Sequence, residues 1–254
     1  MNAGLAAIAV LWRRDLYHFV REPMRVVASV AQPLLFWVLL GSGFGRGLLT
    51  AGGSYSSFFF PGMVLLVVLF ACIFSTISVI DDRQQGFLRA VLAAPVPRAG
   101  VVTGKILGSA TLAFLQGLIV IALAGVADFR PEVAGWASAL VALFVASYAL
   151  AGLGVALAWR SETTSAFHSG MTFLLLPLWM LSGAVFPTVG VPSWLAWVER
   201  LNPLSYALAW LRDALGARAP GDANLVAAVS VTLGFAVLAH ILAALSARRA
   251  TAKA

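Results

Sequence analysis

Ser182 and His240 are the side chains of this sequence whose types could do chemistry together, as a nucleophile and its base inside a membrane. Met180 and Leu181 precede Ser182, so the Gly-x-Ser-Gly pattern of intramembrane serine proteases is absent. Ser182 is expected near one membrane face, whereas His240, shortly before Arg248, is expected in the opposite half. We therefore expect the pair not to meet, and an intramembrane Ser/His enzyme is kept only as an alternative function.

His240 and Gln116 are polar residues within apolar runs, and such residues are functional candidates by default. For His240 we favour a hydrogen-bonded interior side chain. The stretch GVVTGKI is not a phosphate loop, because only three residues separate Gly100 from Gly104 and an isoleucine follows Lys105. Lys105 is expected to anchor a span at the lipid headgroups. A single cysteine, Cys72, makes neither an intrachain disulfide nor a metal site.

The elements that position these residues are predicted to be membrane helices. Of the 254 residues, 61% are hydrophobic and 11% are charged, against roughly 25% charged in a soluble domain. A spanning helix needs about 20 mostly apolar residues. The windows that meet this requirement are 26–45, 58–80, 106–127, 133–158, 171–187 and 224–247. The sequence predicts an all-α integral membrane protein with six spans in a single domain, 1–254.

Basic residues give the predicted orientation. With the N-terminus in the cytoplasm, 12 of the 17 Lys and Arg residues fall on the cytoplasmic side and 5 on the other. Both termini are then cytoplasmic. Because these charges flank spans and form no separate domain, they indicate contact with membrane lipids and not with nucleic acid.

The segment 1–25 is predicted to hold an amphipathic helix that lies in the membrane interface. Pro23 stops this helix. Its apolar face recurs at helical spacing, and its basic residues lie on the other side. The apolar face is Leu5, Ile8, Trp12, Leu16 and Phe19. A simple anchor and a lever that presses on a cytoplasmic partner are both open interpretations of this helix.

The loop DDRQQGFLRAVLAAPVPRAGVVTGK, residues 81–105, contains a second short helix. Asp82 with Gln85 fits a capped start, residues 83–93 form the helix, and Pro95 ends it. Arg83 and Gln84 can face outward. The glycines at 100, 104 and 108 then recur every four residues, which lets another helix approach closely.

Residues 188–223 are predicted to be a helical hairpin on the far side of the membrane, re-entrant or lying on the surface. Asn202 and Pro203 fit the cap and first position of its second helix. That helix has Leu204, Leu208, Leu211 and Leu215 on its apolar face. The tryptophans Trp194, Trp197 and Trp210 suit a membrane interface.

The acidic residues all fall in loops or at span ends. An ion-coupled carrier, the other alternative function, needs charged groups within its spans to bind or relay ions. Energy for transport is therefore expected to come from outside the chain.

The order and spacing of four stretches over nearly the whole chain resemble the permease subunit of an ABC-2 type exporter. These stretches are WRRDLYHFVREP, the 81–105 loop with its continuation ILG, PLWMLSGAVFP and LNPLSYALAWLRDAL. The resemblance implies a transport subunit that is not itself an enzyme and binds no cofactor. ATP and Mg²⁺ would sit on a separate cytoplasmic ABC ATPase. It also implies a second permease copy, identical or related, and a bacterial cell (inner) membrane location.

The resemblance also implies roles for particular residues. A coupling helix would bring Asp82, Arg83, Gln84, Gln85, Phe87, Leu88 and Arg89 to the ATPase. The interfacial helix, with Trp12, Arg13, Arg14 and Arg21, would lie against the same subunit. Candidates for the pathway or its gate are Pro33, Pro177, Trp194, Asn202, Pro203 and Tyr206.

Overall fold

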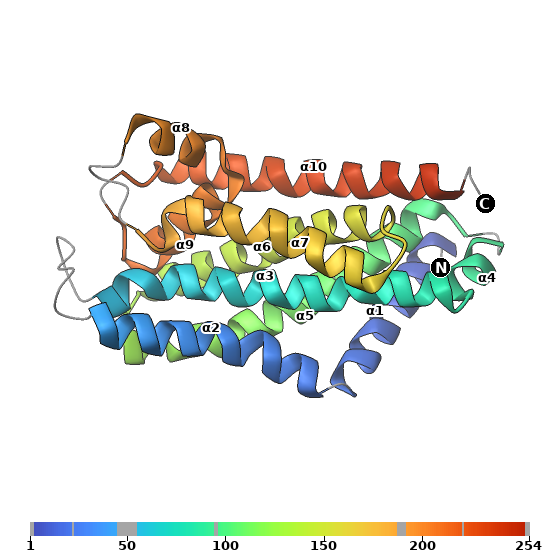
Figure 1. The fold of residues 1–254 in the computed structure, drawn as a ribbon, viewed down its shortest axis with the longest axis horizontal. Coiled ribbons are helices and arrows are strands. Elements are labelled where there is room, and N and C mark those ends of the chain that lie inside the picture. Colours follow the sequence, from blue (N-terminus) through green and yellow to red (C-terminus); the bar gives the residue numbers. More distant parts are fainter. Residues whose placement is uncertain are drawn as a thin grey trace.

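The computed structural model describes residues 3–21, 23–44, 55–93, 96–186, 192–219 and 221–251, which form helices and short connections (Figure 1). The helices in the first half are α1 (Ala3–Val20), α2 (Pro23–Phe44), α3 (Tyr55–Gln84), α4 (Phe87–Ala93), α5 (Arg98–Ile121) and the 3₁₀ helix η1 (Ala122–Ala127). Those in the second half are α6 (Val133–Ala158), α7 (Thr164–Trp179), the π-helical turn η2 (Met180–Ala184), α8 (Ser193–Leu201), α9 (Pro203–Leu215) and α10 (Leu225–Thr251).

Four stretches are long and apolar enough to cross a membrane: Tyr55–Gln84, Arg98–Ala127, Val133–Ala158 and Leu225–Arg248. A shorter apolar segment, Val27–Gly43, lies on α2. The predicted window 171–187 covers the second half of α7, all of η2 and the two residues after it. Its last residue, 187, lies outside the described residues. The all-helical membrane architecture is confirmed, and the count of six spans stays a prediction.

α3 is the central helix of the bundle. In its most apolar window 89% of the residues are buried, against 22% for the window on α10. The neighbours α2, α5, α6 and α7 pack around α3. Since α3 is apolar on all sides, it suits a position surrounded by other helices. α10 packs on α6 and α9 and leaves its other side open.

The predicted close approach along the 100–108 glycines is confirmed, and the helix that approaches is α1. A Cβ atom on Gly100 would lie 3.1 Å from the carbonyl oxygen of Gly4. One on Gly104 would lie 3.1 Å from Cβ of Leu11, and one on Gly108 would lie 3.1 Å from Cβ of Asp15. The missing side chains form a groove on α5 that receives α1.

The two ends of the bundle carry different elements (Figure 1). One end, called the α4 end below, holds α4, the start of α1, the start of α5 and the end of α10. The opposite end, called the α8 end, holds α8, α9 and η2. This division matches the predicted placement of the 81–105 loop and the 188–223 hairpin on opposite sides.

Candidate functional site

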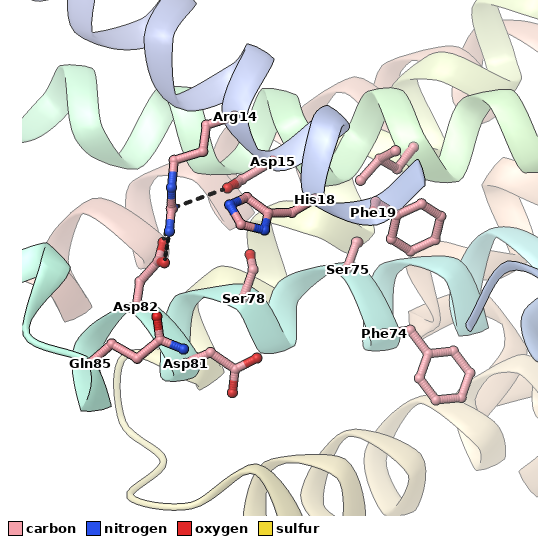
Figure 2. Close-up of a pocket in the computed structure, with 11 residues that line it drawn as sticks. Arg14, Asp15, His18, Phe19, Phe74, Ser75, Ser78, Asp81, Asp82 and Gln85 are labelled. Carbon is pink, nitrogen blue, oxygen red and sulfur yellow. Dashed lines mark hydrogen bonds and ion pairs between the residues drawn. The ribbon is translucent and has the colours of Figure 1, made fainter. Parts of the chain in front are cut away.

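Four charged side chains from three helices meet in one cluster at the α4 end, called the charge cluster below. Arg14 of α1 donates two hydrogen bonds to the Asp82 carboxylate of α3, at 2.7 and 2.5 Å (Figure 2). Lys105 of α5 places Nζ 2.8 Å from Oδ1 of Asp15 and 2.5 Å from Oδ2 of Asp82. α1, α3 and α5 are therefore joined through two carboxylates that share one ammonium group.

The charge cluster is balanced, with two positive and two negative groups, and it is buried except for Arg14, whose side chain is 24% exposed. The Lys105 side chain is 0% exposed, and those of Asp15 and Asp82 are each 5% exposed. Burial raises the pKa of the Asp15 carboxyl, and Lys105 works against that rise. The hydrogen bond to Asp82 raises the pKa of Arg14. Since each charge has a partner, the cluster avoids the large cost of an isolated buried ion.

Arg14 extends the cluster to α4. Its guanidinium carbon lies 3.9 Å from the centre of the Phe87 ring, in the geometry of a cation–π contact. The same group holds Asp82, so one side chain of α1 contacts both the end of α3 and the start of α4. A movement of α4 would act directly on this group.

The capped start predicted at Asp82 is wrong, because α3 continues through Gln84 and Asp82 is used in the charge cluster. The turn is made four residues later by Gly86, whose φ of 77° lies in the left-handed region that glycine tolerates. α4 then runs over Phe87–Ala93 instead of 83–93. Pro95, its predicted end, lies outside the described residues.

The predicted ATPase-contact residues occupy different environments. Leu88 is 1% exposed and packs into the core, so it faces its own chain. Arg83 is half-buried and donates to the carbonyl oxygens of Trp159, at 3.1 Å, and Ser161. Exposed residues in this region are Gln84, Gln85, Ala90 and Ala93. The side chain of Arg89 lies outside the described part.

The buried face of α1 differs from the predicted apolar face. Leu11, Asp15 and Phe19 are buried, together with half-buried Ile8, whereas Leu5 is 61% exposed. This face of α1 is buried because the glycine groove of α5 receives it. Lys105 makes the aspartate acceptable there by forming an ion pair with Asp15. A helix surface alone does not reveal such a partner.

Of the four residues named for their interface role, three lie on different sides of α1 and Arg21 directly follows it. Trp12 is 39% exposed and donates from Nε1 to the Thr111 hydroxyl of α5 at 3.0 Å. Arg13 is exposed. Arg21 is exposed and lies over the ring of Tyr17. Arg14 alone of the four belongs to the charge cluster.

Beside the charge cluster is a cleft of about 110 Å³ between α1 and α3 (Figure 2). His18 and Ser78 lie on its facing sides, and Phe19, Phe74 and Leu112 complete the apolar part. Within the described structure the buried hydroxyl of Ser78 has no hydrogen-bond partner. The volume accommodates a few waters and is well below the roughly 300–1,000 Å³ of a drug-sized pocket. The cleft therefore fits solvent next to the charges better than cargo.

At the α8 end, Asn202 joins two helices. Its side-chain oxygen accepts from the Leu204 amide at 3.0 Å, which confirms the predicted cap with Pro203 following it. Its side-chain nitrogen donates to the Leu178 carbonyl of α7 at 2.6 Å. That carbonyl lies at the π-helical turn that ends α7, where the regular helical bonding changes. Asn202 thus ties the start of α9 to the end of α7.

Arg212 of α9 is a second buried cation, 1% exposed. It donates to the Asp222 carboxylate at 3.0 Å and to the Gly183 carbonyl at 2.8 Å. Its guanidinium carbon also lies 4.5 Å from the centre of the Phe58 ring. Gly183 has a φ of 81°, so Arg212 holds the one left-handed residue of the described η2 turn.

The remaining candidates for the pathway or its gate lie on four different helices, α2, α7, α8 and α9. Pro33 is buried inside α2, and Pro177 is exposed inside α7. Tyr206 donates to the Arg200 carbonyl at 2.9 Å. Trp194 is 63% exposed on α8. Trp210 is 5% exposed and donates to the Ser138 hydroxyl at 3.0 Å, so its ring packs inside the chain, and its predicted place at the membrane interface stays a prediction.

Ser182 and His240 have separate partners, as expected. The Ser182 hydroxyl donates to the Trp179 carbonyl within its own turn, at 2.6 Å. His240 Nδ1 lies 2.9 Å from the Tyr148 hydroxyl, and the two rings stack. Gln116 accepts a hydrogen bond from Ser29 of α2. No dyad of nucleophile and base is formed by the two residues.

Sequence reasoning missed the roles of Asp15 and Lys105 in the charge cluster and the ion pair of Arg212 at the α8 end. Asp15 and Lys105 looked like ordinary surface charges next to spans. A signal existed, because Gly104 and Gly108 flank Lys105 on the predicted close-contact face. A charge on a face that another helix approaches needs a partner on that helix. For Arg212, the comparable signal was its spacing of four residues from Leu208 and three from Leu215, which both lie on the predicted apolar face.

Comparison with known proteins places this architecture in a family. The model of the ABC-2 type transporter family matches residues 6–215. Nodulation protein J of Rhizobium leguminosarum bv. trifolii is 29% identical over 218 residues, covering 83% of this chain and 81% of that protein. Two proteins named as the transport permease ycf38 are also similar. The one from Pyropia yezoensis is 30% identical over 209 residues, 79% of this chain and 71% of that protein. The one from Cyanophora paradoxa is 28% identical over 210 residues, 80% of this chain and 72% of that protein. This multi-pass membrane protein thus belongs to the ABC-2 type transporter family as a permease.

Proposed function

We propose that this permease is the membrane-spanning subunit of an ATP-driven exporter. It forms the transport pathway as a dimer, with a second copy or a related chain, in the inner membrane of a bacterial cell. The α4 end faces the cytoplasm, and the α8 end faces outward. The 12-to-5 distribution of basic residues supports this orientation.

The charge cluster is the observation that carries the proposal. A movement imposed on α4 reaches Arg14 through Phe87, and Arg14 is held to Asp82 by two hydrogen bonds. Lys105 connects the same carboxylate to α5. Force applied to a small surface helix is thereby passed to two long membrane helices through buried, mutually neutralised charges.

ATP and Mg²⁺ are assigned to separate cytoplasmic ABC ATPase subunits, and this chain holds no cofactor of its own. The sequence has no phosphate loop, which supports that division of labour. The buried carboxylate groups of Asp82 on α3 and of Asp222 in the connection between α9 and α10 are held in ion pairs at the two ends of the bundle, so an ion-coupled carrier is the weaker explanation.

The deciding experiment is purification of the tagged chain from native membranes in mild detergent, followed by mass spectrometry. We expect a stoichiometric ATPase carrying Walker motifs, together with a second permease copy. Transport of cargo by the chain reconstituted alone, without any ATPase and without ATP, would rule the proposal out. Vesicles containing both subunits, with and without ATP, provide the comparison.

A further inference from the structure

A cavity of about 510 Å³ lies between the start of α5 and the end of α10, at the α4 end of the bundle. Two arginines line it, and the other described residues of its wall are small or apolar. The described wall consists of Pro97, Arg98, Ala99, Val102, Ala244 and Arg248. None of these residues carries a carboxylate, and the volume lies within the roughly 300–1,000 Å³ of ligand sites. The cavity therefore favours a ligand that has an anionic group and an apolar part.

Both arginines lie at the boundary of a membrane-crossing stretch. Arg98 begins the stretch Arg98–Ala127, and Arg248 ends the stretch Leu225–Arg248. Both side chains are exposed. Because a crossing helix runs from one headgroup region to the other, the two guanidinium groups are placed at the level of the lipid phosphates. A guanidinium binds a phosphate through two parallel hydrogen bonds, so two arginines at this level form a phosphate site.

The α10 side of the cavity continues toward the membrane interior as one face of that helix. This face, with spacings of four, three and four residues, is made by Arg248, Ala244, Ile241 and Val237. Ile241 is 47% exposed and Val237 is 60% exposed. From Arg248 to Val237 the helix rises roughly 16 Å, which is about half of the roughly 30 Å hydrocarbon core. The face therefore offers an acyl chain an apolar surface as deep as one leaflet.

We infer that this cavity binds one anionic phospholipid, whose phosphate lies between Arg98 and Arg248 and whose acyl chain follows Ile241 and Val237. A free phosphate would use the arginines and leave the apolar face unused, and a zwitterionic lipid would balance only part of the positive charge. Basic pockets between membrane helices on the cytoplasmic side suit anionic headgroups for this reason. The lipid links the start of α5 to the end of α10.

This lipid is a resident ligand and not the cargo, so the inference goes beyond the proposed function. The candidates for the pathway or its gate lie on α2, α7, α8 and α9, and the cavity lies between α5 and α10. Only the choice of the cytoplasmic leaflet rests on the orientation proposed above. Binding of the lipid needs neither the ATPase nor ATP.

The test is native mass spectrometry of the full chain, released from detergent micelles that contain equal amounts of phosphatidylglycerol and phosphatidylcholine. We expect one phosphatidylglycerol to stay on each chain, with a preference on the order of 10-fold over phosphatidylcholine. Arg98→Gln combined with Arg248→Gln should abolish this preference. Ala244→Phe keeps both charges but fills the cavity, and it should weaken retention of phosphatidylglycerol by about 10-fold as well.

A matched control removes two exposed arginines at the same end of the bundle but outside the described wall, Arg13→Gln combined with Arg160→Gln. This control should retain phosphatidylglycerol as the wild type does. Excess inorganic phosphate should not displace the lipid, because phosphate has no acyl chain.

Three results would each overturn the inference. One is equal retention of the two lipids by the wild-type chain, and another is undiminished retention of phosphatidylglycerol by the Arg98→Gln, Arg248→Gln chain. The third is displacement of the lipid by inorganic phosphate with no effect of Ala244→Phe, which would assign the cavity to a free anion. Since the purified chain is tested without its partner, each of these results leaves the proposed function standing.

Discussion

Nζ of Lys105 lies 2.8 Å from Oδ1 of Asp15, at the place where Gly104 and Gly108 let α1 touch α5. The glycines bring the two backbones close enough for a short carboxylate to reach the lysine. The ion pair in turn makes a polar residue acceptable on the buried face of α1. Packing and charge pairing therefore depend on each other at this crossing.

Lys105→Met should strongly destabilise the protein, because Asp15 and Asp82 would share only Arg14 and leave one negative charge uncompensated. Removing one partner of a buried pair costs about 3–5 kcal/mol. The double variant Asp15→Asn with Lys105→Met restores neutrality and should recover much of the loss. Tryptophan fluorescence during heating in detergent measures both effects. Equal losses in the single and double variants would contradict the charge-balance argument.

Arg14→Gln should separate ATP hydrolysis from transport. The variant removes the side chain that links Asp82 to Phe87, and it costs some stability because Asp15 and Asp82 then share only Lys105, but it leaves the exposed surface of α4 in place. We expect ATPase to remain bound and ATP turnover to continue, with transport reduced by about 10-fold or more, as for loss of a coupling energy of 1–3 kcal/mol. Comparing turnover and cargo movement in the same vesicles provides the measurement. Parallel losses of both activities would argue against a coupling role.

Gly104→Val should push α1 away from α5. A Cβ atom there already comes within 3.1 Å of Leu11 Cβ and 3.3 Å of the Ile8 backbone, and a branched side chain adds more volume. Overpacking of this kind costs roughly 1–3 kcal/mol. Gly234→Ala on α10 is the control, because nothing lies within 4 Å of its added Cβ. Proteolysis of α1 in detergent should accelerate only in the first variant.

Arg212→Met should loosen the α8 end. Asp222 would lose its buried partner, and the Gly183 carbonyl would lose a donor. The expected loss of stability is about 3–5 kcal/mol. Arg212→Met combined with Asp222→Asn removes the uncompensated charge and should be more stable than the single variant. Thermal unfolding in detergent compares the two, and no difference between them would contradict the pairing.

Ser182→Ala should preserve transport, since the hydroxyl only donates to a carbonyl of its own turn. Tyr148→Phe should also transport, with a stability loss of about 1 kcal/mol for one hydrogen bond to His240. Both variants are assayed in ATP-supplied vesicles beside the wild type. Complete loss of activity in properly folded Ser182→Ala would revive the intramembrane enzyme alternative.

Sequence patterns predicted elements well where one local rule decides the outcome. Asn202 followed by Pro203 marks a helix start by its own chemistry, and the four leucines that follow are all buried. The glycines at 100, 104 and 108 predicted a close contact, but not with which helix. A spacing describes one surface, and the partner is decided by the whole fold.

Residues whose roles depend on distant partners were harder to predict. Asp82 has a sequence neighbour suited to capping, yet it is bound by residues 68 positions before it and 23 after it. Leu88 was expected to meet the ATPase, and its apolar side chain is instead used by the permease core. A variant such as Leu88→Glu would therefore disturb folding as well as docking, and Ala90→Glu is the cleaner probe of the α4 surface.

The pairing of Asp15 with Lys105 also has a consequence for biogenesis. The two residues are 90 positions apart, so the ribosome makes the aspartate well before its lysine. At roughly 5–20 residues per second, the interval is about 5–18 seconds. During that time α1 has an unpaired carboxylate and no glycine groove to enter. α1 therefore reaches its final position only after α2, α3 and α5, which follow it along the chain, have been made.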